Sequence, residues 1–177
     1  IDTTGMGRIP LRTAAAEESI RRIANEVPEV LVGAGTIINV DQAKRAVEAG
    51  AQFLVSPGVN RKVIEYAQEA GVALLPGVCT PSEIITCLEY GIEVVKFFPA
   101  KQYGGLDTIK ALAPVFPNLR FMPTGGVNPG NVLDFLSFER IVAVGGSWMV
   151  KTDWIDEGKF DLVEQTAKSA MEIVKSL

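Results

Sequence analysis

Histidine is missing from this chain of 177 residues. Serine and cysteine catalytic triads need an imidazole as their base, and most catalytic zinc sites use at least one imidazole ligand. Histidine-dependent acid–base chemistry is therefore excluded. Any catalysis must come from lysine, carboxylate, tyrosine and hydroxyl side chains or from backbone amides.

Cysteine, positive charge and long apolar runs are also scarce. The two cysteines, Cys79 and Cys87, cannot build a disulfide framework, so we expect small core residues in a reduced, cytoplasmic protein. The formal net charge is −4 and no basic stripe is present, which argues against a nucleic-acid partner. No run of about 18 apolar residues occurs, so the sequence predicts no membrane span.

What the sequence does contain is a regular alternation of strand and helix signals along one domain, residues 1–177. Hydrophobic residues make up 47% of the chain and charged residues 21%, which suits a soluble globular protein. Short apolar runs begin 19 to 27 residues apart, at Val30, Phe53, Val72, Val94, Phe121 and Ile141. Helix-like stretches span residues 14–25, 41–49, 61–70, 106–112, 129–136 and 161–174, and a further one opens at Pro81.

Short apolar strands that each lead into a helix indicate a parallel sheet covered by helices. Their even spacing, without a Gly-x-Gly-x-x-Gly motif, favours an α/β fold of the (βα)8 TIM-barrel type over an open doubly wound sheet. Ile9-Pro10-Leu11 reads as a poor second strand, because proline suits a strand interior badly. We therefore expect a barrel that lacks its first βα unit and exposes two strand edges, which favours association.

Lys96 lies inside the apolar run Val94-Val95-Lys96-Phe97-Phe98-Pro99, which reads as a buried strand. Desolvation disfavours an ammonium ion, so such a lysine has a lowered pKa and its neutral amine can form a Schiff base with a carbonyl compound. Strand alternation places Val94, Lys96 and Phe98 on one face. The alternative is a lysine at a strand end that extends to water or pairs with a carboxylate.

The expected carboxyl ends of the strands carry small residues and hydroxyl groups. In barrels the active site lies at these ends, and phosphate is commonly held by backbone amides after strands 7 and 8. Thr124-Gly125-Gly126 follows the seventh barrel strand and Gly145-Gly146-Ser147 follows the eighth, which predicts an anion site. Ordinary βα turns also select glycine, serine and threonine, so each loop alone has a second interpretation.

Five motifs, in order, resemble those of the 2-keto-3-deoxy-6-phosphogluconate (KDPG) aldolase family, from about Leu11 to the C-terminus. They are Gly33-Ala34-Gly35-Thr36, residues 53–58, Val95-Lys96-Phe97-Phe98-Pro99-Ala100, residues 121–127 and Val144-Gly145-Gly146-Ser147-Trp148. The resemblance implies a class I aldolase, typically a homotrimer, with no metal and no cofactor. It implies cleavage of KDPG to pyruvate and glyceraldehyde 3-phosphate, and many members also act on 4-hydroxy-2-oxoglutarate.

The resemblance also implies roles for single residues. Lys96 corresponds to the Schiff-base lysine, and Arg12 to the residue that binds the pyruvate carboxylate. Thr36 and Thr124 correspond to hydrogen-bonding partners of the keto acid, and Pro57 and Phe98 to the pocket wall. The implied phosphate ligands are Gly125, Gly126, Gly146 and Ser147.

One position departs from the family pattern. The family carries a glutamate, its general acid–base, four residues before the arginine, whereas this chain has Arg8 there. Arginine stays protonated and cannot act as a base, and the nearest upstream carboxylate is Asp2. We therefore expect weakened turnover by an enzyme that still captures pyruvate. The alternatives are a non-catalytic binder of keto acids or sugar phosphates, and a self-assembling scaffold derived from this fold.

Overall fold

The computed structural model of the protein describes residues 6–177, so Asp2 lies outside the described part. The chain divides into two compact units, one ending at Phe98 and the other running from Pro99 to Leu177. Each unit is built from parallel strands and helices and is described by itself.

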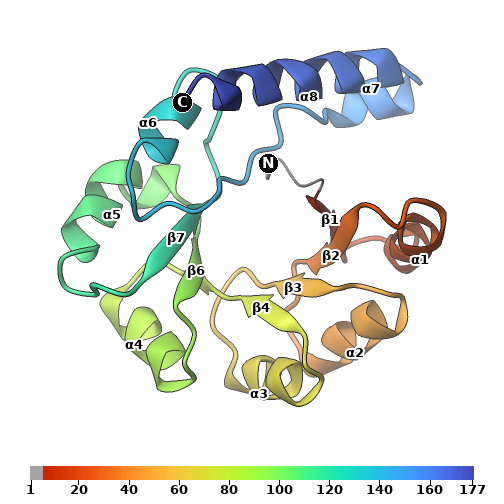
Figure 1. Ribbon diagram of the computed structural model, residues 1–177. Coiled ribbons are helices and arrows are strands. Elements are labelled where there is room, and N and C mark those ends of the chain that lie inside the picture. The colour runs from red at the N-terminus through yellow and green to blue at the C-terminus, as the bar shows by residue number, and fades with distance from the viewer. Residues whose placement is uncertain (1–5) are drawn as a thin grey trace. The chain divides into compact units, whose positions relative to one another are not determined.

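The first unit begins with four strands that alternate with three helices (Figure 1). The strands form one parallel sheet in the order β1-β2-β3-β4. The elements are β1 (Met6–Pro10), α1 (Ala16–Glu26), β2 (Leu31–Gly35), α2 (Val40–Glu48), β3 (Phe53–Val55), α3 (Arg61–Glu69) and β4 (Ala73–Leu75). After β4 come β5 (Gly77–Val78), α4 (Pro81–Glu89) and β6 (Val94–Phe97), with β5 and β6 parallel.

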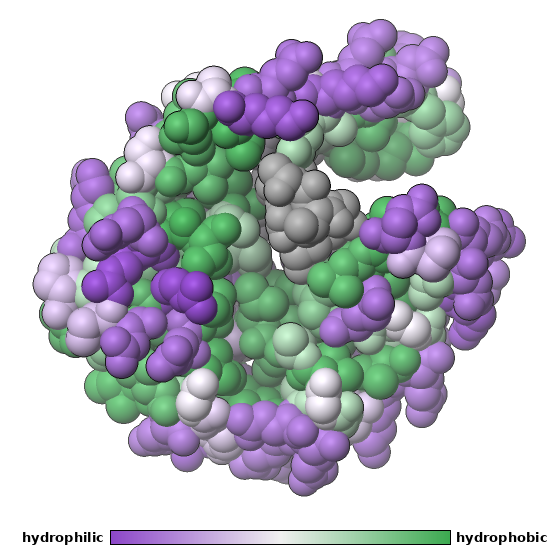
Figure 2. All heavy atoms as spheres, in the orientation of Figure 1, coloured by the Kyte–Doolittle hydropathy of each residue, from purple (hydrophilic) through white to green (hydrophobic). Residues whose placement is uncertain are grey.

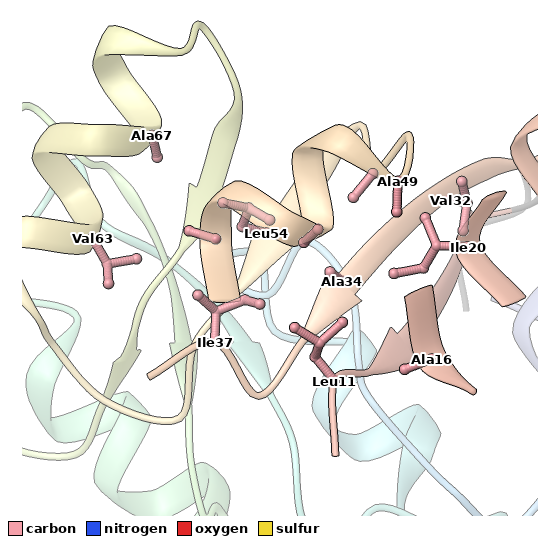
Figure 3. Packing of buried hydrophobic residues seen from close by; sticks show 13 residues of the cluster. Leu11, Ala16, Ile20, Val32, Ala34, Ile37, Ala49, Leu54, Val63 and Ala67 are labelled. Carbon is pink, nitrogen blue, oxygen red and sulfur yellow. The ribbon is translucent and has the colours of Figure 1, made fainter. Parts of the chain in front are cut away.

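The core of this unit lies between the sheet and the helices α1, α2 and α3. Figure 3 shows Val32 and Ala34 of β2 and Leu54 of β3 on the sheet face that meets Ile20 of α1 and Val63 of α3. Alternation within β2 then turns Gly33 and Gly35 to the opposite face. Hydrophilic side chains line the outer side of the helices (Figure 2).

Helix α4 begins with a complete capping box. Thr80 Oγ1 accepts a hydrogen bond from the backbone N–H of Glu83, and a carboxylate oxygen of Glu83 accepts from the backbone N–H groups of Cys79 and Thr80. Burial alone would raise the pKa of Glu83, but these hydrogen bonds lower it below its usual value. On the same helix, burial and then the nearby Glu83 charge raise the pKa of Cys87 to about 11, so this thiol behaves as a core residue.

The second unit contains one continuous strand and several helices. They are η1 (Lys101–Tyr103), α5 (Gly105–Leu112), β7 (Arg120–Pro123), α6 (Val132–Leu136), α7 (Thr152–Asp156) and α8 (Phe160–Lys175). Beside β7, Phe121 pairs with Ile141 and Thr124 with Gly145 in isolated parallel bridges. These bridges align the segment after α6 with β7.

Most expected elements are present, and three features differ from the expectation. β1 is a full strand whose five residues align with β2, and Pro10 is tolerated because it is the last of them. The expected strand at Ile141 is reduced to the two bridges. Helix α7 and strand β5 have no apolar periodicity long enough to predict them from the sequence.

Candidate active site

Strand β6 places Lys96 in the first unit with its side chain almost completely buried. The backbone N–H of Lys96 donates to the carbonyl of Pro76 at 2.9 Å, and Gly77 of β5 is its partner in the parallel register. Val95 and Phe97 are fully buried on the opposite face of the strand, whereas Lys96 is 4% exposed. The predicted alternation along this strand is therefore present, and Lys96 does not extend to bulk water.

The surroundings of the Lys96 amine favour its neutral form. Nζ lies 4.0 Å from the centre of the Phe98 ring, and no carboxylate among residues 6–177 forms an ion pair with it. Burial and then the positive charge of Arg8 lower the pKa of Lys96 to about 8. A substantial fraction of the amine is thus unprotonated, and nucleophilic, near neutral to mildly alkaline pH.

Arg8, the residue in the position of the family's glutamate, lies on the face of the β1–β4 sheet opposite the one that packs against α1, α2 and α3. Its partner in the register is Gly33 of β2, and its side chain covers Gly35. A Cβ atom on Gly35 would lie 2.7 Å from a guanidinium nitrogen of Arg8, so a larger residue there would displace the Arg8 side chain. Burial and then the positive charge of Arg12 lower the pKa of Arg8 from its usual value.

Two further residues from the sequence analysis, Thr36 and Pro57, follow β2 and β3. Thr36 has a φ of 62°, and it is the one non-glycine residue in residues 6–177 with a positive φ. For a β-branched residue this is a strained conformation, which places a hydroxyl at the end of β2. A Cβ atom on Gly77 would overlap the carbonyl of Pro57, so glycine lets the loop after β3 pack against the register partner of Lys96.

In the second unit, the predicted phosphate loops lie side by side. Thr124 and Gly145 form a parallel bridge, and the N–H of Gly145 donates to the carbonyl of Pro123 at 2.8 Å. The Thr124 hydroxyl is buried and has no hydrogen-bond partner within the described chain. An unsatisfied buried hydroxyl is unfavourable by itself, which is expected where a ligand supplies the partner.

The glycines of these loops occupy positions where a Cβ atom would be strained or would clash. Gly125 and Gly126 have φ values of 98° and 82°. The carbonyl of Gly126 accepts from the side-chain amides of Asn128 and Asn131 at 3.2 and 3.0 Å. A Cβ atom on Gly146 would overlap the Trp148 ring, so the absence of a side chain there lets the tryptophan pack against the loop.

The predicted residues thus fall into two groups, one in each unit. The first unit holds Lys96, Phe98, Thr36, Pro57 and the exposed Arg12, and the second holds Thr124, Gly125, Gly126, Gly146 and Ser147. The sequence analysis noted Arg8 as a lost base but missed its electrostatic effect on Lys96. Separately, no helix within residues 6–177 is both long and apolar enough to cross a membrane.

Comparison with known proteins gives one consistent result. Residues 5–166 match the family model for KDPG and KHG aldolases. The chain is 42% identical to the KHG/KDPG aldolase of Escherichia coli over 167 residues, covering 94% of this chain and 78% of that one. It is 43% identical to the 2-dehydro-3-deoxy-phosphogluconate aldolase of Treponema pallidum over 166 residues, covering 94% and 79%.

Comparison with solved structures also identifies KDPG aldolases as similar proteins. A crystal structure of KDPG aldolase from Legionella pneumophila, with pyruvate captured as a covalent carbinolamine intermediate, superposes with a TM-score of 0.88. It is 37% identical, and the match covers 91% of this chain and 78% of that one. The fold class is therefore the α/β, TIM-type fold of these aldolases.

Proposed function

Because the chain belongs to the family of KDPG and KHG aldolases, we propose that it is a class I aldolase that uses Lys96 to form a Schiff base. Its substrate would be 2-keto-3-deoxy-6-phosphogluconate, with pyruvate and glyceraldehyde 3-phosphate as products, and 4-hydroxy-2-oxoglutarate as a further substrate. The observation that carries this proposal is Lys96 itself, which is buried and has a pKa of about 8.

The chemistry follows from this amine. The neutral Nζ attacks the C2 carbonyl carbon, and loss of water from the carbinolamine leaves a protonated imine. As the C3–C4 bond breaks, its electron pair passes to the imine and the C4 hydroxyl gives its proton to water, which releases the aldehyde and leaves an enamine of pyruvate on Lys96. Protonation of the enamine at C3 and hydrolysis of the resulting imine then release pyruvate and the free amine. The face of the Phe98 ring, 4.0 Å from Nζ, stabilises the positive charge on the imine nitrogen.

The remaining residues bind the substrate. Arg12 would hold the carboxylate, Thr36 and Thr124 would donate hydrogen bonds to the keto acid, and Pro57 would form part of the wall. The unpartnered Thr124 hydroxyl supports a ligand contact at that position. Gly125, Gly126, Gly146 and Ser147 would bind the phosphate through their exposed amides and the serine hydroxyl.

The presence of Arg8 in place of the family's glutamate predicts slow turnover. A positioned general base contributes about 10²- to 10⁴-fold to rate, and an arginine does not supply one. Formation of the imine needs the neutral amine, which this chain has, whereas proton transfer during turnover needs the missing base. We propose that pyruvate capture is retained and that turnover is reduced by about this factor.

Borohydride reduction in the presence of pyruvate tests the Schiff base. We expect the intact mass to rise by one reduced pyruvate unit, with the modified peptide containing Lys96. Lys96→Ala should remove the adduct, whereas Lys110→Ala, which changes an exposed lysine on α5, should leave it unchanged. An unmodified native protein, or an adduct that persists in Lys96→Ala, would contradict the proposal.

Cleavage itself is measured by coupling pyruvate release to lactate dehydrogenase. A rate above that of Lys96→Ala indicates an aldolase. The alternative is a binder that holds the keto acid without turnover, and the replacement of the family's glutamate by Arg8 favours it. Rates equal to those of Lys96→Ala, together with a pyruvate adduct, would establish that alternative.

We further propose that the protein is a cytoplasmic homotrimer, as is typical of the family. Several large apolar side chains of the second unit are exposed, and such residues are commonly covered by neighbouring copies.

A further inference from the structure

The loop that follows β3 is held by a buried serine. Ser56 is 2% exposed, and its Oγ donates a hydrogen bond to the carbonyl of Gly58 at 2.6 Å. Its backbone N–H donates to the carbonyl of Leu75, at the end of β4, at 3.1 Å. Ser56 therefore fixes the turn of residues 56–58 and ties it to the neighbouring strand. The proposed chemistry does not use this hydroxyl.

The peptide that this turn carries lies beside Lys96. A Cβ atom on Gly77 would lie 2.2 Å from the carbonyl oxygen of Pro57 and 2.9 Å from the backbone nitrogen of Gly58, so the Pro57–Gly58 peptide takes the place of a side chain on Gly77. Gly77 and Lys96 are partners in the parallel register, and such partners direct their side chains to the same face. Because neighbouring strands are about 4.8 Å apart, the peptide lies against the first carbons of the Lys96 side chain.

Ordinary turns also contain hydrogen bonds from serine to the backbone, so this bond alone indicates only a stable turn. Two observations separate it from an ordinary turn. Its serine is buried, and the peptide that it fixes covers a lysine that is 4% exposed. Without the hydroxyl, the Gly58 carbonyl loses its partner, and water can enter beside the lysine to supply one.

We propose that Ser56 is a positioning residue, which holds the Pro57–Gly58 peptide against Lys96 and so excludes water from that side of the amine. Ser56 acts through the peptide and does not touch the substrate. Since desolvation favours the neutral amine, the serine increases the fraction of Lys96 that can attack a carbonyl carbon. This inference rests on the proposed Schiff-base function of Lys96.

A substitution of Ser56 leaves the charges around Lys96 unchanged. Burial and then the charge of Arg8 lower the pKa of Lys96. Strands β4 and β5 and the loop itself carry no ionisable side chain, and Cys79, which follows β5, directs its thiol to the carboxylate of Glu83 at 3.5 Å. A changed pH dependence in a Ser56 variant therefore reports the access of water to the amine.

The test is the pH profile of pyruvate trapping, measured as the initial rate at saturating pyruvate by intact mass after brief borohydride treatment. We expect the midpoint of Ser56→Ala to move to higher pH by about 0.5 to 1 unit, a small part of the effect that full burial has on a lysine. Near pH 7 the rate should then fall about three- to tenfold, whereas near pH 10 it should approach that of the native protein, because the amine is mostly neutral in both.

Two control variants separate this effect from a general loss of structure. Ser19→Ala removes a hydrogen bond from serine to the backbone in α1 and should keep the native midpoint. Ile20→Val loosens the core at a fully buried position of the same helix and should also keep it. Ser56→Cys fills the space with a weak donor and should behave as Ser56→Ala does, which tests the inference if the alanine variant does not fold.

An unchanged midpoint in a folded Ser56 variant, or an equal change in Ile20→Val, overturns the inference and leaves the proposed function intact. A rate that falls by the same factor at every pH also overturns it, because lost structure alone has that effect. Absence of the pyruvate adduct from the native protein overturns the inference and the proposed function together.

Discussion

At the scale of single residues, opposing effects set the protonation state of Lys96. Burial and the charge of Arg8 favour the neutral amine, whereas the Phe98 ring stabilises the ammonium. The result is a pKa of about 8, at which the residue is nucleophilic without being fully deprotonated. We therefore expect the arginine at the position of the family's glutamate to slow proton transfer during turnover and to assist formation of the imine.

This balance predicts a pH dependence. Arg8 lowers the pKa of Lys96, so removing its charge in Arg8→Gln makes protonation of the amine easier and raises that pKa. The initial rate of pyruvate trapping should rise with pH through a midpoint near 8 in the native protein, and the midpoint should move to higher pH in Arg8→Gln. The profile is measured by intact mass after brief borohydride treatment at each pH.

Because burial is the larger influence on Lys96, the midpoint of Arg8→Gln should still fall below the ordinary lysine value of 10.5. Arg120→Gln, which changes an exposed arginine at the start of β7, should keep the native midpoint. An identical midpoint in folded Arg8→Gln would mean that Arg8 has no influence on the amine.

Residue patterns predicted part of this site well. The apolar run around Lys96 and strand alternation were sufficient to predict its burial, because both depend on neighbours in the chain. The coupling of Arg8 to Lys96 was not predictable, because it depends on how β1 and β6 are brought together. The positive φ of Thr36 was also missed, since threonine rarely adopts it.

At the scale of elements, local signals located most helices. The ends of α2 and α3 agree with the sequence to within about two residues, because Asn39 and Asn60 cap their starts and glycines follow their ends. The segment at Ile141 was predicted as a strand from its apolar run. A strand is defined by continuous hydrogen bonding to a neighbouring segment, and here only two isolated bridges form. Such pairing depends on both segments, so the sequence of one segment does not predict it.

The capping box of α4 gives a prediction at this scale. Thr80→Ala removes the hydroxyl that accepts from the N–H of Glu83, and loss of such a cap costs about 1 kcal/mol of stability. Urea unfolding followed by circular dichroism measures the difference. Thr86→Ala is the control within the same helix, and it should change the free energy of unfolding by less than about 0.5 kcal/mol because alanine is a good helix former.

Equal stabilities of Thr80→Ala and the native protein would show that Glu83 alone holds the start of α4. Its carboxylate already accepts hydrogen bonds from the backbone of Cys79 and Thr80.

At the scale of the whole molecule, the TIM-type fold could be predicted from the alternation of strands and helices, because the pattern repeats along the chain. Oligomeric assembly could not be predicted in this way, because the surface residues that form subunit contacts show no periodic pattern in the sequence. In the second unit, Val115, Val142 and Phe160 are 67%, 43% and 63% exposed. Apolar exposure of this kind favours contact with further copies of the chain.

We therefore predict a solution mass of about three times 19.0 kDa at micromolar concentration, measured by light scattering after size-exclusion chromatography. Phe160→Asp, which places a charge at the start of α8, tests whether that surface contributes and should shift the mass towards smaller species if it does. A native mass equal to that of one chain would contradict the trimer.

The backbone at Thr36 has a consequence for how this protein can change. A left-handed residue other than glycine costs about 1–2 kcal/mol, so Thr36→Gly would relax the turn and increase resistance to unfolding. The same replacement would delete the hydroxyl at the end of β2. Because Thr36 is proposed to donate a hydrogen bond to the keto acid, stability and substrate binding place opposite demands on this position.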